Sequence, residues 1–473
     1  MAGDGAGKIK MKVFMCSSEM VPFAKTGGLA DALGALALAL EKYDIEIRIA
    51  LPKYKIVAGC NSQVASFSSD IDVAKIGRNI QVYLVKNDAY FNRDGLYGDK
   101  TEDYPDNLER FSFYCRRSLD LLKEINFKPD IIHCHDWQAG LIPLYLKTIY
   151  HKDSFYKGIK TLFTIHNLGF QGVFDKDEFP KLGLGWSLFN IDALEFYHKV
   201  NILKGAIIYS DLLNTVSPAY AREIQTKEFG CGLEGVLQAR KEGLSGILNG
   251  LDYELWNPQK DPYLDKAYSM NTIEDKYVNK RMLQVECGLS LGKALPLFGM
   301  VSRLTHQKGL DLIAESLEDL LSCLKMQIIV LGVGDVRYRN LLEGLAKNYP
   351  GNVSAQIKFD ERLAHKIYAG CDIFLMPSRF EPCGLGQMIA LRYGAIPLVF
   401  KTGGLADTIS EENGFIFNSY TKEDFIAAVN LAVSTYMNKR KWAELIKKAF
   451  TCNFSWEKSA GEYIRLYNAL LNN

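Results

Sequence analysis

The stretch Ser378-Arg-Phe-Glu-Pro-Cys-Gly-Leu-Gly386 connects an apolar run to a helix-forming run. Residues 372–376 predict a buried strand, and residues 387–393 predict a short helix. A helix that begins after a glycine-rich turn presents unpaired backbone N–H groups and the positive end of its dipole. Because Gly384 and Gly386 also let the backbone approach a ligand closely, the stretch predicts a binding turn for an anion such as phosphate.

Glu381 is the only carboxylate of this turn. A carboxylate beside an anion pocket suits a centre that develops positive charge as a phosphate leaves. A solvated glutamate in a surface loop is the alternative interpretation, since connecting loops usually run over the surface. The turn alone leaves both interpretations open.

The heptapeptide Lys25-Thr-Gly-Gly-Leu-Ala-Asp31 recurs without change at 401–407. One copy follows a strand-like run at 12–16, the other follows a run at 396–400, and both lead into helix-prone sequence. Seven consecutive identities at equivalent strand-to-helix positions favour two similar halves. We therefore expect two nucleotide-binding α/β domains that face each other.

The first copy of the heptapeptide could form a binding site of its own. Lys25 and the amides of Gly27 and Gly28 could contact a diphosphate or a sugar at a helix N-terminus. A tight structural turn with an exposed lysine is the alternative interpretation.

Length and composition restrict the class of protein. A chain of 473 residues is too long for one hydrophobic core, and two domains agree with the repeat. A net charge of +1 offers no strong field for nucleic acid, and no run approaches the roughly 18 apolar residues of a membrane span. The ten cysteines are scattered without a Cys-x-x-Cys pair, and the chain opens without a secretory signal. This pattern predicts reduced thiols in a compartment such as the cytoplasm.

Strand-like and helix-like runs alternate along both halves of the chain. The alternation predicts two doubly wound α/β domains, at 11–250 and 251–454, with a charged, proline-containing connection at 252–270. Ligands of such sheets bind beyond the carboxyl ends of the strands. The expected strands are 11–16, 46–51, 80–85, 130–134, 160–165, 212–216, a strand that ends at 247–250, 297–301, 327–331, 353–358, 372–376 and 396–400.

Two strands of the first domain end in polar residues, in His133-Cys-His-Asp-Trp137 and in Ile165-His-Asn-Leu-Gly169. The His-x-His-Asp cluster could bind a metal, but residues along a strand point alternately to opposite faces and no third ligand lies at metal spacing. A sugar site that uses His166, Asp136 and the face of Trp137 fits better, because sugars need polar partners and aromatic surfaces.

The loop Ser302-Arg-Leu-Thr-His-Gln-Lys-Gly309 carries two cations after the strand at 297–301. Arg303 can bind a phosphate with two hydrogen bonds, and Lys308 can add a point charge. Solvated surface charges are the alternative interpretation. A nicotinamide site is not expected further on, because Gly332-Val-Gly334 is followed by Arg at the position of the third glycine.

Six ordered motifs together resemble the bacterial glycogen synthases and plant starch synthases, from about residue 11 to the C-terminus. The resemblance implies a GT-B glycosyltransferase, with two Rossmann-like domains across a deep cleft and a last helix, 455–473, that completes the first domain. The motifs are Lys-Thr-Gly-Gly-Leu-Ala-Asp at 25–31, His-Asp-Trp at 135–137, Ile-His-Asn at 165–167, Asn-Gly-Leu-Asp at 249–252, Ser-Arg-Leu-Thr with Gln-Lys-Gly at 302–309, and Ser-Arg-Phe-Glu-Pro-Cys-Gly-Leu at 378–385.

The resemblance implies that glucose moves from a nucleoside diphosphate glucose to the non-reducing end of an α-1,4-glucan, with retention of the anomer and without a metal. Arg303 and Lys308 should neutralise the leaving diphosphate, and Glu381 should support the oxocarbenium-like centre or position the sugar. Lys25 should contact the phosphate and glucose of the donor. Further donor contacts are expected from Gly28, Asp136, His166, Asn249, Lys280, Phe359, Cys383, Gly384, Leu385 and Gly386, and acceptor or sugar contacts from Tyr97 and Trp137.

Departures from the family pattern leave the donor base open. Phe359 stands where a base-stacking Tyr is expected, Lys358 replaces a Gly, and Gly386 replaces a Thr. The resemblance implies ADP-glucose as the donor, and these departures keep UDP-glucose as the alternative. A glucan phosphorylase and a non-catalytic glucan-binding module are remote alternatives. The resemblance places the protein in the bacterial cytosol, or in the plastid stroma of a plant or alga.

Overall fold

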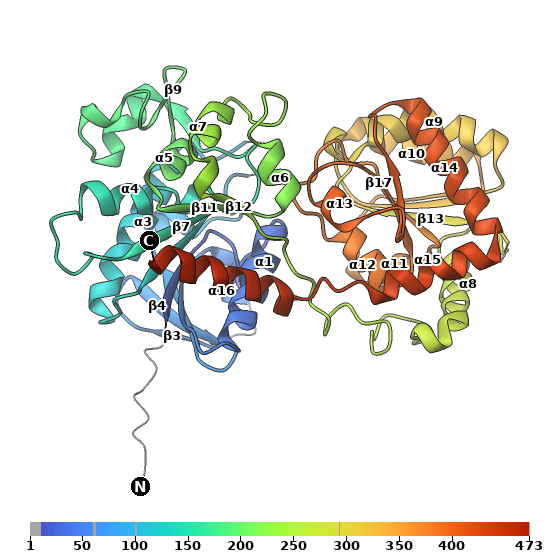
Figure 1. Ribbon diagram of the computed structural model, residues 1–473, viewed down its shortest axis with the longest axis horizontal. Coiled ribbons are helices and arrows are strands. Elements are labelled where there is room, and N and C mark those ends of the chain that lie inside the picture. Colours follow the sequence, from blue (N-terminus) through green and yellow to red (C-terminus); the bar gives the residue numbers. More distant parts are fainter. Residues whose placement is uncertain (1–10, 60–62, 100–101, 293, 473) are drawn as a thin grey trace, which may run out of the picture. The chain divides into compact units, whose positions relative to one another are not determined.

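The structure is a computed structural model that describes residues 11–59, 63–99, 102–292 and 294–472. The chain divides into two compact units (Figure 1). Unit 1 consists of Met1–Gly250 with Trp456–Asn473, and unit 2 consists of Leu251–Ser455.

Unit 1 is built on a nine-stranded sheet in the order β12-β11-β7-β6-β1-β2-β5-β4-β3. The strands from β12 to β5 pair in parallel, and the β3–β4 and β4–β5 pairs at one edge are antiparallel. The strands are β1 (Lys12–Cys16), β2 (Glu46–Pro52), β3 (Val64–Ser66), β4 (Ile71–Ile76), β5 (Ile80–Val85), β6 (Ile131–His135), β7 (Lys160–Ile165), β11 (Leu212–Thr215) and β12 (Leu244–Gly246).

Helices cover this sheet, so its central strands are buried along almost their whole length, as in β1 and β6. A small antiparallel sheet, β8-β10-β9, adds β8 (Val173–Asp175), β9 (Glu195–Phe196) and β10 (Lys199–Asn201). The α-helices are α1 (Gly28–Glu41), α2 (Asp88–Phe91), α3 (Asn107–Glu124), α4 (Leu141–Thr148), α5 (Ile202–Tyr209), α6 (Pro218–Glu223), α7 (Glu234–Ala239) and α16 (Trp456–Asn472).

Unit 2 is built on a six-stranded, all-parallel sheet in the order β15-β14-β13-β16-β17-β18, with its own hydrophobic core. The strands are β13 (Leu297–Val301), β14 (Gln327–Leu331), β15 (Val353–Gln356), β16 (Ile373–Met376), β17 (Ile396–Phe400) and β18 (Phe415–Phe417). The α-helices are α8 (Lys276–Glu286), α9 (Leu310–Cys323), α10 (Val336–Asn348), α11 (Glu361–Gly370), α12 (Gly386–Arg392), α13 (Gly403–Thr408), α14 (Lys422–Met437) and α15 (Lys439–Thr451).

The C-terminal helix α16 packs against α1 in unit 1 (Figure 1). Its buried tyrosines reach polar side chains of the sheet, because a buried hydroxyl needs a partner. The Tyr467 hydroxyl lies 2.8 Å from Nδ1 of His133, and Asn214 donates to the Tyr463 hydroxyl at 3.0 Å. An ion pair between Lys42 and Glu457 adds a surface contact. Polar bonds as well as apolar packing therefore fix the helix to unit 1.

The repeated heptapeptide does not mark equivalent positions, which corrects the argument for two similar halves. Its first copy follows the first strand of unit 1 after residues 17–24 and opens the 14-residue helix α1. Its second copy directly follows β17, the fifth strand of unit 2, and opens the six-residue helix α13. Both units are doubly wound, but the repeat is not the reason.

Other differences concern the edges of the sheets. The strand expected to end at 247–250 is β12, which already ends at Gly246. The antiparallel strands β3 and β4 were not expected, and neither was the short edge strand β18. The central strands β7, β13, β14 and β17 have the expected bounds, because long apolar runs identify strands that are buried on both faces.

Tyr467→Phe should lower the free energy of unfolding by about 1–3 kcal/mol, because it leaves Nδ1 of the buried His133 without its hydroxyl partner. Denaturant unfolding of parent and variant measures this change. The matched control is Tyr43→Phe, which removes the hydroxyl of an exposed tyrosine and should change stability by less than about 0.5 kcal/mol. Equal effects of the two substitutions would contradict the assignment.

Candidate active site

A pocket of about 220 Å³ lies at the carboxyl ends of β13 and β16 in unit 2. Its lining includes the predicted residues Arg303, Lys308, Glu381, Gly384, Leu385 and Gly386. The two strands are neighbours in the sheet, so the loop after β13 and the turn after β16 begin side by side. The topology thus brings together two motifs that are more than seventy residues apart in the chain.

Lys308 and Glu381 form an ion pair in this pocket, with Nζ 2.5 Å from Oε2. Both side chains are largely buried, and the glutamate is not the solvated surface residue of the alternative interpretation. Arg303, by contrast, is exposed at the pocket. The pocket therefore combines one carboxylate with two cations, one of them free to turn toward a ligand.

Two glycines are required for this arrangement. Gly309 has a φ of 78°, and a Cβ there would lie 2.1 Å from the carbonyl oxygen of Pro377. The loop of Lys308 can therefore approach the turn of Glu381 only without a side chain at 309. Gly384 has a φ of 73°, and a Cβ there would lie 3.0 Å from Cγ of Glu381.

The turn that carries Glu381 is hydrogen-bonded to two residues, Gln387 and Gly404, for which the sequence predicted no such role. Gln387, fully buried in α12, donates from Nε2 to the carbonyl oxygens of Cys383 and Gly384, at 3.1 Å each. Gly404 of the second heptapeptide donates its N–H to the carbonyl oxygen of Glu381 at 3.0 Å. The only sequence signal for this contact was the repeat itself, which carries no information about what it packs against.

In unit 1, Asp136 and His166 lie at the carboxyl ends of β6 and β7. Asp136 accepts the backbone N–H of His166 at 2.7 Å, so its carboxylate fixes the neighbouring loop. Burial raises the pKa of Asp136 to about 7. Nε2 of His166 lies 3.0 Å from Nδ1 of His135, and burial lowers the pKa of His166 to about 3. His166 is therefore a neutral imidazole at neutral pH, which can hydrogen-bond without carrying charge.

The first heptapeptide presents an open surface in unit 1. Lys25 pairs with Asp31 at 2.8 Å, and both side chains are exposed. A Cβ at Gly28 would meet nothing within 4 Å, so there is room for a ligand. The expected anion contact of the Gly27 amide is wrong, because this N–H already donates to the carboxylate of Glu19 at 3.2 Å. Further along, the buried Asn249 has an Oδ1 without a hydrogen-bond partner among the described residues.

The structure corrects one predicted aromatic contact and leaves another untested. Trp137 is only 8% exposed, with Phe111 and Phe174 packed against its ring, so it offers no open face to a sugar. Trp137 therefore supports the fold behind the loops. The contact of Tyr97 stays a prediction; this residue is half-buried, and its hydroxyl lies 2.6 Å from Oε1 of Glu19 and 2.7 Å from Oγ of Ser18.

Lys280 is also not where the resemblance implied. Its ammonium group, on a side chain 3% exposed, donates to Asp372 at 2.6 Å and to the carbonyl oxygen of Leu295 at 2.5 Å. Both partners precede their strands, β16 and β13, so Lys280 lies at the edge of the parallel sheet opposite to the pocket. Phe359, in contrast, follows β15 at the same edge of the sheet as the pocket; it is 86% exposed and does not line the pocket.

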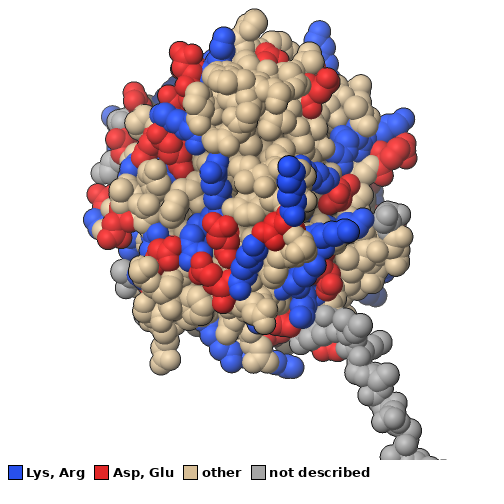
Figure 2. Space-filling model, turned by 90° about the vertical axis from the view of Figure 1, so that its left-hand side faces the viewer, with Lys and Arg blue, Asp and Glu red and all other residues tan. Residues whose placement is uncertain are grey.

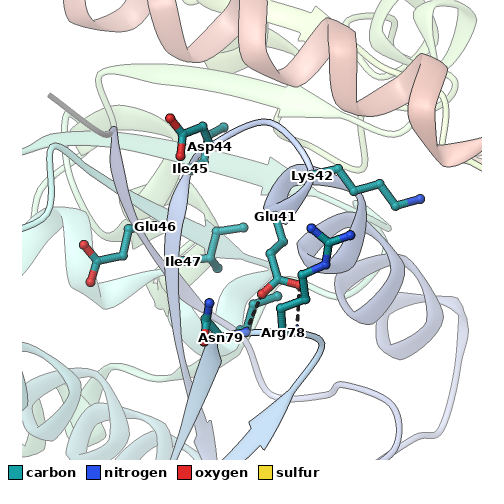
Figure 3. A pocket seen from close by; sticks show the side chains of 9 residues that line it. Glu41, Lys42, Asp44, Ile45, Glu46, Ile47, Arg78 and Asn79 are labelled. Atoms are coloured by element: carbon teal, nitrogen blue, oxygen red, sulfur yellow. Dashed lines mark hydrogen bonds between the residues drawn. The ribbon is translucent and has the colours of Figure 1, made fainter. Parts of the chain in front are cut away.

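A second pocket, of about 290 Å³, lies in unit 1 where β2 and β5 begin (Figure 3). None of the predicted site residues lines it. The Glu41 carboxylate accepts the backbone N–H groups of Arg78 and Asn79 at 2.9 and 2.5 Å, and these bonds close the turn before β5. The hollow is thus a product of a structural cap at the amino-terminal edge of the sheet.

In the face shown in Figure 2, acidic and basic side chains are interspersed instead of gathered by sign. Of the helices within the described residues, none combines the length and apolar character that a membrane crossing requires. Across 11–59, 63–99, 102–292 and 294–472, no three His, Cys, Asp or Glu side chains gather so that they could hold a metal ion.

Comparison with known proteins identifies both parts of the chain. The family description "Starch synthase catalytic domain" matches residues 12–239, and "Glycosyl transferases group 1" matches residues 290–449. A glycogen synthase of Geotalea daltonii is 48% identical over 98% of this chain and 99% of its own length. A glycogen synthase of Thermotoga petrophila is 45% identical over the same shares of the two chains.

The fold is also that of a solved plant enzyme. The catalytic domain of starch synthase IV from Arabidopsis thaliana, bound to ADP and acarbose, superposes with a TM-score of 0.86. It is 34% identical, over 98% of this chain and 99% of that one. Two doubly wound α/β units with these matches define a glycosyltransferase of the GT-B class. The chain belongs to the glycogen and starch synthase family, and it is a glucosyltransferase that elongates an α-1,4-glucan.

His166 should stay neutral from about pH 8 to about pH 5, because burial keeps its folded pKa at about 3 against an ordinary value of 6.5. Between pH 6.5 and about pH 3, His166 binds more protons in the unfolded chain than in the folded chain. The contribution of His166 to the free energy of unfolding is therefore lost as the pH falls through this range. Imidazole ¹⁵N shifts, assigned by the signal missing in His166→Asn, measure the titration. A midpoint between about pH 5.5 and 7.5 would contradict this assignment.

Proposed function

We propose that the chain transfers glucose from ADP-glucose to the non-reducing end of an α-1,4-glucan, with retention of the anomeric configuration. Support comes from the glycogen synthases that match over almost the whole chain and from the starch synthase that was solved with ADP and acarbose. In the reaction, the bond between C1 of glucose and the diphosphate breaks. A bond from C1 to an acceptor hydroxyl oxygen forms, and the hydroxyl proton leaves with the diphosphate.

The pocket of unit 2 is the observation that carries the proposal. Arg303 and Lys308 line it together with the glycine turn before α12, and two cations with nearby amides suit a diphosphate. Glu381 lies in the same pocket, 2.5 Å from Lys308. Its negative charge favours the oxocarbenium-like C1 that develops as the diphosphate leaves.

We propose that these cations, and not a metal ion, neutralise the diphosphate. A divalent cation usually serves this purpose in phosphate chemistry. Here a guanidinium and an ammonium group stand at the pocket as fixed charges of the chain. When a diphosphate draws Lys308 away from Glu381, the carboxylate is released toward the sugar.

Residues of unit 1 complete the proposed set. Lys25 and Gly28 contact the donor from the first heptapeptide, whose surface is open. His166 and Asn249 hydrogen-bond the sugar, since one is a neutral imidazole and the other has an unpartnered amide oxygen. Lys280 and Trp137 have no part in the proposal, and Tyr97 stays a proposed sugar contact.

The adenine base is proposed to stack on Phe359. Its ring is exposed after β15, at the carboxyl edge of the sheet, where an aromatic face can receive a base. A ring face accepts uracil as well as adenine, so UDP-glucose is the competing donor. The ADP in the plant starch synthase favours adenine. We further propose a cytoplasmic location, because the cysteines of the described residues are free thiols.

Incubation of the parent protein with radiolabelled ADP-glucose or UDP-glucose and glycogen tests the proposed function. We expect label in the glycogen, a preference for ADP-glucose of at least about tenfold in kcat/KM, and unchanged activity in excess EDTA. Digestion of the product by a β-amylase, which needs α-1,4 links at the non-reducing end, checks the linkage. Absence of transfer from both donors would refute the proposal, and loss of activity in EDTA would refute the role of the cations.

Glu381→Gln should reduce kcat by about a hundredfold or more while ADP binding persists, because the amide keeps the shape but loses the charge that favours C1. Lys308→Ala should instead weaken ADP binding, since it removes a cation from the pocket. Stopped-assay kinetics and titration calorimetry with ADP separate the two effects. Near-parent turnover in Glu381→Gln, or a Kd within about twofold of the parent in Lys308→Ala, would remove that residue from its assigned role.

A further inference from the structure

Glu19 is a buried carboxylate just after β1 that no motif of the sequence pointed to. It is 3% exposed, and no ion pair of the described residues involves it. Its oxygens accept four hydrogen bonds, from the Thr26 N–H at 2.5 Å, the Thr26 hydroxyl at 2.6 Å, the Gly27 N–H at 3.2 Å and the Tyr97 hydroxyl at 2.6 Å. Bonds to a charged acceptor are stronger than bonds between neutral groups, so the loop around Thr26 is firmly held.

The carboxylate occupies the position that an external anion would need. Thr26 and Gly27 immediately precede α1, where the helix dipole and unpaired N–H groups attract negative charge. Because Glu19 already accepts the N–H groups of Thr26 and Gly27, these two amides are not available to a phosphate. What remains for a ligand is the Lys25 side chain and the open surface of Gly28.

Glu19 is itself held in place by neighbouring polar groups. The Ser17 hydroxyl donates to the carbonyl oxygen of Glu19 at 3.0 Å. The Tyr97 hydroxyl donates to Glu19, and it therefore accepts from the Ser18 hydroxyl at 2.7 Å. This series of bonds connects the end of β1 to the loop and explains why Tyr97 is turned inward.

The second copy of the heptapeptide shows that this arrangement is not a property of the seven residues. There, Thr402 donates its N–H to the carbonyl oxygen of Phe400 at 3.0 Å, and Gly404 donates to the carbonyl oxygen of Glu381. The N–H of the threonine is thus bonded to a backbone carbonyl in the second copy and to a side-chain carboxylate in the first. The same sequence is fixed by two different environments.

We propose that Glu19 is a positioning residue of the transferase, which fixes the backbone at 25–28 so that Lys25 and Gly28 are presented to the sugar diphosphate. The inference rests on the proposed function, in which Lys25 contacts the donor. Lys25 pairs only with the exposed Asp31 among the described ion pairs, so its side chain can turn toward a ligand while its backbone stays fixed. Glu19 acts through Lys25 and does not contact the substrate.

A double-mutant cycle between Glu19→Gln and Lys25→Ala tests this role. Glutamine replaces one acceptor oxygen by an N–H donor that faces the N–H groups of the loop, so kcat/KM for the donor should fall by about tenfold or more. If Glu19 acts through Lys25, the double variant should be within about twofold of Lys25→Ala alone. If Glu19 only stabilised the fold, the effects of the two substitutions on kcat/KM would multiply in the double variant.

The matched control is Asp211→Asn. Asp211 accepts the N–H and the hydroxyl of Thr161, at 2.7 Å each, so it makes the same pair of bonds to one threonine at the opposite, amino-terminal edge of the sheet. Its substitution should lower stability and leave kcat/KM within about twofold of the parent. Thermal unfolding of every variant shows whether a lower kcat/KM comes from a less stable fold or from displacement of the loop at 25–28.

Thr26→Val provides a second test if Glu19→Gln does not fold, because it removes one hydroxyl bond to Glu19 and keeps the side-chain volume. We expect a loss of about threefold to tenfold in kcat/KM that disappears in the Lys25→Ala background. Two results would overturn the role of Glu19 and leave the proposed function intact. In an active parent, either the kcat/KM of Glu19→Gln stays near that of the parent, or the effects of the two substitutions on kcat/KM multiply in either cycle. A parent that transfers no glucose would overturn the proposed function first, and this inference with it.

Discussion

The ion pair between Lys308 and Glu381 depends on one feature of the fold, the adjacency of β13 and β16 in a parallel sheet. Parallel strands end at the same edge, so the loop after one strand and the turn after its neighbour share a small volume. Gly309 lets the loop approach the turn, while Gln387 and Gly404 fix the turn from behind. The cations and the carboxylate of the pocket are therefore positioned by backbone that cannot easily move, which lowers the cost of ordering a charged ligand.

The polar groups at the carboxyl ends of the unit 1 strands differ in charge from those of the unit 2 pocket. Burial lowers the pKa of His133 and of His166 to about 3, so both imidazoles are neutral at neutral pH. The Glu19 carboxylate accepts hydrogen bonds from N–H and O–H groups of unit 1. The pocket of unit 2 thus presents charged side chains, whereas these groups of unit 1 are neutral or already hydrogen-bonded.

Several sequence-based roles failed for a common reason. Lys280 and Trp137 belong to polar or aromatic types that occur in binding sites, yet their side chains pair with Asp372 and Phe111 inside the units. A motif gives the residue type and its position in the chain, but not the direction of a side chain or its partner. The repeat misled in the same way, since identical residues open α1 and α13 in unrelated surroundings.

The sequence by itself determined the class of fold, most of the central strands and the pocket motifs at Arg303, Lys308 and Glu381, because long buried runs and glycine-flanked turns leave local signals. Only the tertiary structure decided that Lys308 pairs with Glu381, that Lys280 lies at the opposite sheet edge, and that Glu19 holds the loop after Lys25. These contacts join segments whose proximity depends on strand order and side-chain direction. The local pattern of residues does not determine strand order or side-chain direction, because both arise when distant segments pack into one sheet.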